Sequence, residues 1–205
     1  MITKIFLIGN GESRIGFDLE KLRSQGKIYG CNAIYRDFTP DVLIGVDTPT
    51  TRELIESDYA QNGGELWVRQ YPSKEHEKMA KGKNIHHFRE IFRPKDFGWC
   101  SGSSGCYIAC QQNALAKEVY LIGVDIVSNT KTLNNIYKGT KNYFDVNYRA
   151  RKNINWRNQW RVLFSKFPDK QFIKVNKAKN DEKVNQPIPE WEGVKNIKYI
   201  TLEDL

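Results

Sequence analysis

Three short stretches of this chain are apolar on both faces of any strand that they form. They read IFLIG near the start, VLIGV after residue 41 and VYLIGV after residue 118. Such strands are typical of parallel sheets covered by helices on both sides, whereas antiparallel strands tend to alternate apolar and polar residues. The sequence therefore predicts an α/β fold, a Rossmann-like three-layer sandwich with a mostly parallel sheet.

Segments rich in β-forming residues alternate with segments of helical periodicity along the whole chain. The expected strands are Lys4–Ile8, Lys27–Gly30, Val42–Val46, Glu65–Val68, Ile85–Phe88, Glu118–Val124, Gln171–Val175 and Asn196–Ile200. The expected helices are Phe17–Ser24, Thr50–Ser57, Ser104–Leu115 and Ile154–Phe167. The helical spacing of Trp156, Trp160, Leu163, Phe164 and Phe167 predicts that they form the core face of the last helix.

The net charge of +8 arises from one segment. Residues 1–130 contain 16 basic and 16 acidic side chains, whereas residues 131–179 contain 13 basic side chains and only two acidic ones. We therefore divide the chain into an α/β core, 1–130, and a basic segment, 131–205, packed on the same domain. Concentrated positive charge favours a polyanionic partner such as nucleic acid, or forms a solvated basic face without a specific ligand. The nucleic-acid-binding candidates are Lys138, Lys141, Arg149, Arg151, Lys152, Arg157 and Arg161.

The apolar runs near the N-terminus are too short for a membrane span or a signal sequence, which predicts a cytoplasmic protein without stable membrane association. The four cysteines include no C-x-x-C pair, and Cys106 and Cys110 stand one helical turn apart, as buried thiols do. No metal site and no cofactor apart from a donor substrate is predicted.

Polar residues follow four of the expected strands, where ligands of open parallel sheets bind. They are Asn10, Asn32, Asp47 and Asp125, and we expect them to share one crevice. Two Gly/Ser-rich turns add backbone N–H groups that suit phosphate, although serines also serve as simple helix caps. The donor-binding candidates are Gly9, Asn10, Gly11, Ser13, Arg14, Asn32, Ser103, Ser104 and Gly105.

The order GNG-x-S, CN-x-x-Y, SG opening a helix and E-V/I-Y-L-x-G-x-D resembles the bacterial sialyltransferases that build lipooligosaccharide from CMP-sialic acid. This likeness covers roughly residues 4–126. The motifs GNG-x-SR-x-x-FDL, YGCNA-x-YRDF and NNIYKGTKNY are similar to those of uncharacterised, glycosyltransferase-like proteins of tailed phages, and this second likeness is the closer of the two.

The resemblance implies a metal-independent, GT-A-like variant fold. It places the nucleotide contacts on Asn10, Ser13, Asn32, Ser104 and Gly105. That family stabilises the departing phosphate with two tyrosines; Val127 stands at the first position and Tyr137 matches the second. Its catalytic histidine lies in the C-terminal part, whereas all three histidines of this chain precede Asp125.

A carboxylate is therefore the candidate general base for transfer to a hydroxyl group. Asp47 ranks first because Pro49 ends the strand and leaves that carboxylate at the crevice, although a helix cap is the alternative role. Asp125 and Asp145 are the other candidates. Tyr137, Lys138, Lys141 and Arg14 are candidates for neutralising the leaving phosphate, and both lysines also fit a solvated basic surface.

The function predicted from the sequence is a metal-independent glycosyltransferase, with residues 1–130 as its nucleotide-sugar-binding core and residues 131–205 as its basic acceptor-side segment. It would move a sugar from a nucleotide-sugar to a hydroxyl acceptor, a hydroxymethylated pyrimidine in phage DNA, in the cytoplasm of the host cell. One alternative is a sialyltransferase-like enzyme acting on a surface glycan. Another is a non-catalytic nucleotide- or nucleic-acid-binding module, or a relative of pterin pyrophosphokinases.

Overall fold

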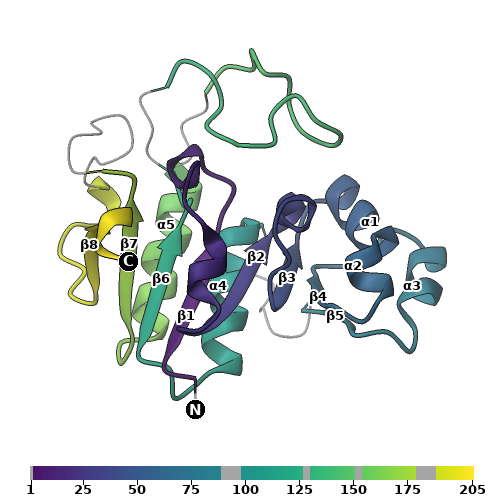
Figure 1. Cartoon of the computed structure of the whole chain (residues 1–205), viewed down its shortest axis with the longest axis horizontal. Coiled ribbons are helices and arrows are strands. Elements are labelled where there is room, and N and C mark those ends of the chain that lie inside the picture. Colours follow the sequence, from purple (N-terminus) through teal and green to yellow (C-terminus); the bar gives the residue numbers. More distant parts are fainter. Residues whose placement is uncertain (1, 89–97, 127–129, 151–153, 179–187) are drawn as a thin grey trace.

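A computed structural model describes residues 2–88, 98–126, 130–150, 154–178 and 188–205 (Figure 1). Eight strands form one sheet in the order β5-β4-β3-β2-β1-β6-β7-β8, and every neighbouring pair runs parallel. The strands are β1 Lys4–Ile8, β2 Lys27–Cys31, β3 Val42–Gly45, β4 Glu65–Val68, β5 Ile85–His87, β6 Glu118–Ile122, β7 Gln171–Asn176 and β8 Ile197–Thr201. The α/β fold with a parallel sheet is confirmed.

The strand order reverses between β1 and β6. From β1 the chain adds strands outward to β5, and it then returns to place β6 on the other side of β1, with Ile8 opposite Ile122. In open α/β sheets, ligands bind beyond the carboxyl ends of the strands at such a reversal. Segment 131–205 contributes α5, β7 and β8, so it extends the same sheet.

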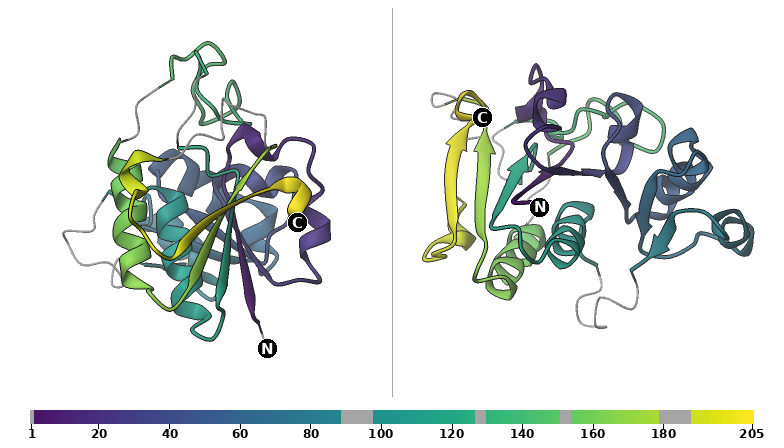
Figure 2. Two further views of the ribbon diagram at one scale, coloured as in Figure 1. Left: turned by 90° about the vertical axis from the view of Figure 1, so that its left-hand side faces the viewer. Right: turned by 60° about the horizontal axis from the view of Figure 1, so that its bottom comes forward.

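Helices cover the two faces of the sheet (Figure 1 and Figure 2). They are α1 Thr48–Glu56, α2 Asp58–Gln61, α3 Lys74–Ala80, α4 Ser101–Gln112 and α5 Ile154–Lys166. Short 3-10 segments lie between or after strands, at Glu12–Arg14, Leu19–Leu22, Asn32–Arg36, Pro189–Trp191 and Leu202–Asp204. Within the part of the chain that the structure describes, none of these helices combines the length and apolar character that a membrane crossing needs.

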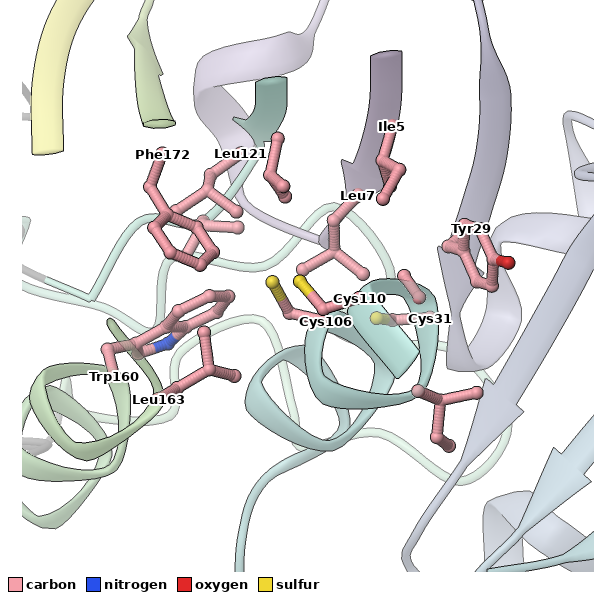
Figure 3. Packing of buried hydrophobic residues seen from close by; sticks show 14 of the residues in the cluster. Ile5, Leu7, Tyr29, Cys31, Cys106, Cys110, Leu121, Trp160, Leu163 and Phe172 are labelled. Carbon is pink, nitrogen blue, oxygen red and sulfur yellow. The ribbon is translucent and has the colours of Figure 1, made fainter. Parts of the chain in front are cut away.

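Alternate residues of each central strand enter separate cores, as the doubly apolar strands predict. Ile5 and Leu7 face α4 and α5, where Cys106, Cys110 and Trp160 complete the packing (Figure 3). Phe6 and Ile8, by contrast, belong to the cluster that α1 and α2 cover. All four cysteines are free thiols.

Buried Lys170 fixes the far end of α4. Its ammonium group donates hydrogen bonds to the backbone carbonyls of Asn113, Ala114 and Ala116 at 3.0, 3.1 and 2.7 Å. A cation here satisfies carbonyls just beyond the helix C-terminus and complements the negative end of the helix dipole. The opposite end of α4, which carries the Ser-Gly sequence, consequently stays in place at the carboxyl edge of the sheet.

The helices differ from expectation mainly at their ends. The predicted helix Phe17–Ser24 is wrong, since only the 3-10 segment Leu19–Leu22 forms there, with the Asp18 carboxylate capping it through the Glu20 N–H. Helix α4 begins three residues earlier than predicted. Helices α2 and α3 were not predicted, because four and seven residues are too short to establish a helical period.

Candidate functional site

A cavity of about 150 Å³ lies beyond the carboxyl ends of the central strands. Asn10, Asn32, Asp47 and Asp125 all line it, although they come from four different loops. The structure thus brings together the four polar residues that the sequence expects to converge, and their roles in binding or catalysis stay predictions. The other lining residues are Gly9, Gly11, Cys31, Cys100, Ser101, Gly102, Gly123, Val124, Ile126, Asn134, Asn135, Trp156 and Trp160.

The loop after β1, residues 9–14 (the first loop), lies directly against the chain that leaves β6, and its glycines make this close approach possible. The N–H groups of Gly9 and Gly11 donate to the carbonyls of Ile122 and Gly123, both at 2.8 Å. A Cβ on Gly9 would lie 2.4 Å from the Gly123 oxygen, and one on Gly11 would lie 2.4 Å from the Asp125 carboxyl group. These glycines are explained by loop packing, and their N–H groups are not available to a phosphate.

Asp125 holds the first loop in position. Its carboxylate accepts hydrogen bonds from the Ser13 backbone N–H at 2.8 Å and from the Ser13 hydroxyl at 2.6 Å. The side chain is 1% exposed and lies 4.0 Å from the buried ammonium group of Lys174. Burial lowers the pKa of Lys174, and the Asp125 carboxylate partly offsets that effect. Asp125 therefore fits a positioning residue better than a general base, and Ser13 is committed to it.

Arg14 is equally committed to contacts within the chain. Its buried guanidinium group donates to the Gly9 carbonyl at 3.0 Å and to the Tyr137 hydroxyl at 2.9 Å, and lies 3.4 Å from the Asp37 carboxylate. The Tyr137 hydroxyl donates to the same Asp37. Burial and this hydrogen bond raise the pKa of Tyr137. The predicted roles of Arg14 and Tyr137 at a leaving phosphate do not fit this geometry.

Asn10 keeps one unsatisfied polar atom. Its Nδ2 group donates to the Tyr143 hydroxyl at 3.2 Å, and that hydroxyl also accepts from the Ala33 N–H at 3.2 Å. The Asn10 Oδ1 atom is buried without a hydrogen-bond partner. Because a buried unpaired acceptor is costly, such an atom at a cavity indicates a place for a ligand donor.

Asn32 reaches the cavity through an unusual backbone conformation. Its φ of 54° lies in the left-handed region, which asparagine tolerates better than most residues. The Asn32 Oδ1 atom accepts a hydrogen bond from the Ser101 hydroxyl at 2.9 Å. This bond connects the loop after β2 to the first turn of α4.

The residues of α4 that line the cavity lie earlier in the chain than the predicted Ser103, Ser104 and Gly105. Ser101 and Gly102 line the cavity, whereas Ser103, Ser104 and Gly105 lie behind it. The Ser103 hydroxyl donates to Gln159 at 2.9 Å, and Gly105 packs against the sheet. The expectation that residues 103–105 line the crevice is therefore wrong. It followed from starting the helix at Ser104, so the sequence pointed to the correct helix but the wrong turn.

Asp47 places at the rim a carboxylate that makes no hydrogen bond within the described part of the chain. Burial lowers the pKa of Arg69, and the Asp47 charge partly offsets that effect. Asp47 stands at the N-cap of α1, yet only its backbone carbonyl takes part, accepting the Thr51 N–H at 2.8 Å. The side chain makes no capping hydrogen bond and is exposed. Pro49 in the first turn needs no N–H partner, so the helix starts without help from the carboxylate. The predicted catalytic residues are Asp47, Asp125 and Tyr137, and of these Asp47 is the one placed to meet a ligand, because Ser13 occupies Asp125 and Arg14 and Asp37 occupy Tyr137.

Trp156 is one of the lining residues that sequence reasoning did not assign to the site, as are Ser101, Asn134 and Asn135. Helical spacing groups Trp156 with Trp160, Leu163, Phe164 and Phe167, and Trp160, Leu163 and Phe164 are indeed buried. Trp156, however, is 39% exposed and lines the cavity. It belongs to the first turn of α5, where the helix meets the carboxyl edge of the sheet.

The predicted nucleic-acid-binding residues fall into three groups. Lys138 pairs with Glu12 at 2.7 Å, Arg157 pairs with Glu190 at 3.2 Å, and Arg161 donates to the Glu190 carbonyl at 2.6 Å. The side chains of this first group make contacts within the chain, so their predicted contacts with nucleic acid do not fit this geometry. Lys141 and Arg149 are exposed, and Arg151 and Lys152 lie outside the described residues.

The loop of residues 130–150 lies beyond the carboxyl ends of β1 and β6 (Figure 1). The Ile136 N–H donates to the Asn10 carbonyl at 2.9 Å, and the Asn134 side chain accepts from the Glu12 N–H at 2.7 Å. Arg36 holds the far part of the loop through the Thr140 hydroxyl at 2.8 Å. The segment with the NNIYKGTKNY motif thus forms one wall of the site.

The contacts of Tyr35 predict a pH-dependent loss of stability. Its hydroxyl donates to Glu53 at 2.6 Å, and burial together with that bond raises the pKa of Tyr35 to about 12. A raised folded-state pKa gives stability that is present below about pH 10 and is lost as the pH rises toward 12. In urea denaturation across this range, Tyr35→Phe should show a shallower decline than the wild type. An unchanged slope would contradict the assignment.

A larger groove of about 790 Å³ lies elsewhere, beside α2. Tyr35, Glu56 and Tyr59 help to line it, but none of the predicted site residues does. The Tyr59 hydroxyl contacts three backbone carbonyls, at Pro40, Asp41 and Glu65, within 3.1–3.3 Å. With this polar group already satisfied, size alone does not make the groove the better candidate.

Among the described residues, no group of three or more His, Cys, Asp or Glu side chains is arranged to hold a metal ion. Comparison of the chain with protein-family models, with curated proteins and with solved structures finds no match.

Proposed function

We propose that this chain is a metal-independent glycosyltransferase, with a GT-A-like variant of the parallel α/β fold, that uses a nucleotide-sugar donor. One observation carries the proposal. The free carboxylate of Asp47, the unsatisfied Asn10 and the start of α4 share one cavity at the reversal of the strand order.

The proposed reaction is a displacement at the anomeric carbon of the donor sugar. The oxygen of the acceptor hydroxyl forms a bond to that carbon while the bond between the carbon and the phosphate oxygen breaks. Asp47 takes the hydroxyl proton, and the nucleotide leaves with the bonding electron pair on its phosphate. The N–H group of Ser101, the first residue of α4, is the group of the cavity best suited to a phosphate oxygen, because the Gly102 N–H already contacts the Cys100 thiol.

The size of the cavity limits how much of the donor it encloses. Pockets that bury a small ligand usually measure about 300–1,000 Å³, whereas this one is about 150 Å³. It can surround one ring of a nucleotide-sugar, and the rest must extend across the rim. Asp47 and Trp156 are both exposed there, so the reacting carbon would lie at the open side, where an acceptor can approach.

For the acceptor we propose a hydroxymethylated pyrimidine in DNA. Lys141 and Arg149 support this because both are exposed on the loop of residues 130–150, whereas Arg157 and Arg161 are committed elsewhere. Binding of duplex DNA should be measured over a salt series, since phosphate contacts predict a steep loss of affinity as salt rises. An affinity that does not change with salt concentration, or no binding at all, would contradict DNA as the acceptor. A surface glycan would then be the acceptor to test next.

The donor is best identified by thermal shift with a panel of CMP-, UDP-, GDP- and ADP-linked sugars. A ligand that binds only the folded chain raises its stability by mass action, by about 2.7 kcal/mol at one hundred times its dissociation constant. A shift with one nucleotide series would name the donor and supply the substrate for a transfer assay.

Replacing Asp47 with asparagine should lower the rate of sugar transfer by a factor of about 10²–10⁴, the usual contribution of a general base. Donor affinity should stay within a few-fold, because the amide keeps the shape of the side chain. Asp169→Asn is the matched control. Asp169 is an exposed aspartate that pairs with Lys117, and it lies just before the start of β7, at the edge of the sheet opposite the cavity. Unchanged transfer in Asp47→Asn would refute this role, and a chain that binds donors without any turnover would be a binding module.

A further inference from the structure

The charges around the cavity are unlike those of a typical phosphate site. Its described lining residues include no lysine and no arginine, but they include the carboxylates of Asp47 and Asp125. Lys174 is the cation near Asp125, and it lies 4.0 Å away on β7, in a fully buried position. A phosphate inside this cavity would meet no cationic side chain of the described lining; Arg69, which interacts with Asp47, lies outside that lining. The exposed Asp47 carboxylate would repel it, whereas the Asp125 carboxylate is turned to Ser13.

The N-terminus of α4 makes up for little of the missing positive charge. A helix N-terminus favours an anion by about 0.3–1 kcal/mol near the surface, which is at most about a fivefold gain in affinity. Phosphate sites usually add charge-assisted hydrogen bonds from arginine or lysine, which are considerably stronger. The balance of charges therefore favours an uncharged group inside the cavity.

The remaining lining residues are suited to a hydroxyl-bearing ring. The Nδ2 groups of Asn32 and Asn135 can donate to a ligand, because among the described residues only their Oδ1 atoms are engaged, by the Ser101 hydroxyl and the Tyr137 N–H. The exposed Asp47 carboxylate can accept a hydrogen bond from a hydroxyl group, whereas the Asp125 carboxylate is occupied by Ser13. The buried Oδ1 atom of Asn10 lacks a donor. Beside these polar groups, Trp156 offers an exposed aromatic side chain at the mouth, against which a ring can pack.

We infer that the cavity encloses an uncharged, hydroxyl-bearing ring that packs on Trp156, while the phosphate of the donor lies at the rim of the cavity and not inside it. The ring is either the ribose of the nucleoside or the transferred sugar, which share this chemistry. The inference rests on the site of the proposed function, and it states which part of the donor that site recognises.

The test compares uncharged compounds with their phosphorylated forms by isothermal titration calorimetry. One arm uses the common nucleosides, a second uses methyl glycosides, and a third uses nucleoside monophosphates and diphosphates, each at low and moderate salt. We expect one uncharged arm to bind, and its identity tells ribose from transferred sugar. Adding phosphate should improve affinity by no more than about fivefold, with little dependence on salt.

Two results would overturn the inference. One is that phosphorylated forms bind more than about fivefold tighter than every uncharged compound, as a charge-dominated site requires. The other is that no uncharged compound binds at all. Sugar transfer is measured separately, so a charge-dominated site that still transfers sugar refutes the ring assignment alone. A ring-binding site without transfer refutes only the proposed function.

Variants of Trp156 test the aromatic contact. Trp156→Leu should weaken binding of the uncharged ligand by about three- to tenfold, because the smaller leucine side chain covers less of the ring and buries less apolar area. Trp156→Phe should retain most of the affinity. Tyr199→Leu removes a comparably exposed aromatic side chain, on β8 and outside the cavity, and should leave affinity unchanged. Equal affinities for wild type and Trp156→Leu would contradict the packing of the ring on this side chain.

Discussion

Replacing Asp125 with alanine is expected to destabilise the folded chain by about 3–5 kcal/mol, the usual cost of removing one partner of a buried ion pair. The change removes the acceptor of both Ser13 hydrogen bonds and leaves the Lys174 ammonium group buried without its carboxylate. Total folding free energies are about 5–15 kcal/mol, so this loss should be plain in urea denaturation.

The control for Asp125→Ala is Asp169→Ala, which breaks the exposed pair with Lys117 and should cost less than about 1 kcal/mol. A second variant separates charge from shape. Lys174→Met in the Asp125→Ala background removes the unpaired buried cation, and it should recover part of the lost stability. If Asp125→Ala is as stable as the wild type but loses sugar transfer, then Asp125 is a catalytic base and the positioning role is wrong.

The sheet was predictable because its strands carry a strong local signal. IFLIG, VLIGV and VYLIGV are apolar at every position, and a strand buried on both faces has few alternatives in a compact chain. The helices were less predictable at their ends. Phe17–Ser24 has the apolar spacing of a helix, but Asp18 caps a shorter 3-10 turn, and Gly16 before it adopts a φ of +87°.

The cavity was predictable in its location but not in the state of its side chains. Parallel strands must deliver Asn10, Asn32, Asp47 and Asp125 to one edge, and this follows from topology alone. The sequence does not reveal that Asp125 is occupied by Ser13, because the two residues lie 112 positions apart. Only the structure shows that the Asp47 carboxylate at the rim makes no hydrogen bond with the residues described, whereas the Asp125 carboxylate holds a loop in position.

Trp156 illustrates the opposite error. Its spacing fits the apolar stripe of α5, and the residues one and two turns further on are buried as that stripe requires. An apolar stripe shows which side of a helix faces the sheet. It does not show at which turn of the helix the sheet ends. The first turn of α5 reaches the edge of the sheet, so the same periodic position becomes a surface that faces the cavity.

Arg14 should be the second position at which one substitution has a large effect. Arg14→Met is expected to destabilise the chain by about 2–4 kcal/mol, because hydrogen bonds to a charged group contribute about 1.5–3 kcal/mol and their buried partners lose them. The guanidinium group joins three segments, through the Gly9 carbonyl, the Asp37 carboxylate and the Tyr137 hydroxyl. Arg14→Lys should recover only part of the loss, since an ammonium group cannot reproduce the planar fork.

Hydrogen exchange at single amides can tell whether Arg14 holds the wall of the cavity in particular or stabilises the whole fold. Without Arg14, Tyr137 loses its link to the first loop, and the loop of residues 130–150 should open more often than the sheet does. Amide hydrogen exchange at Ile136, whose N–H donates to the Asn10 carbonyl, should then accelerate more than exchange at Leu7 in β1. Arg23→Met, which removes an exposed partner of Glu20, is the control and should change neither site. Equal acceleration at both amides would mean that Arg14 supports the fold as a whole and has no special hold on the wall of the cavity.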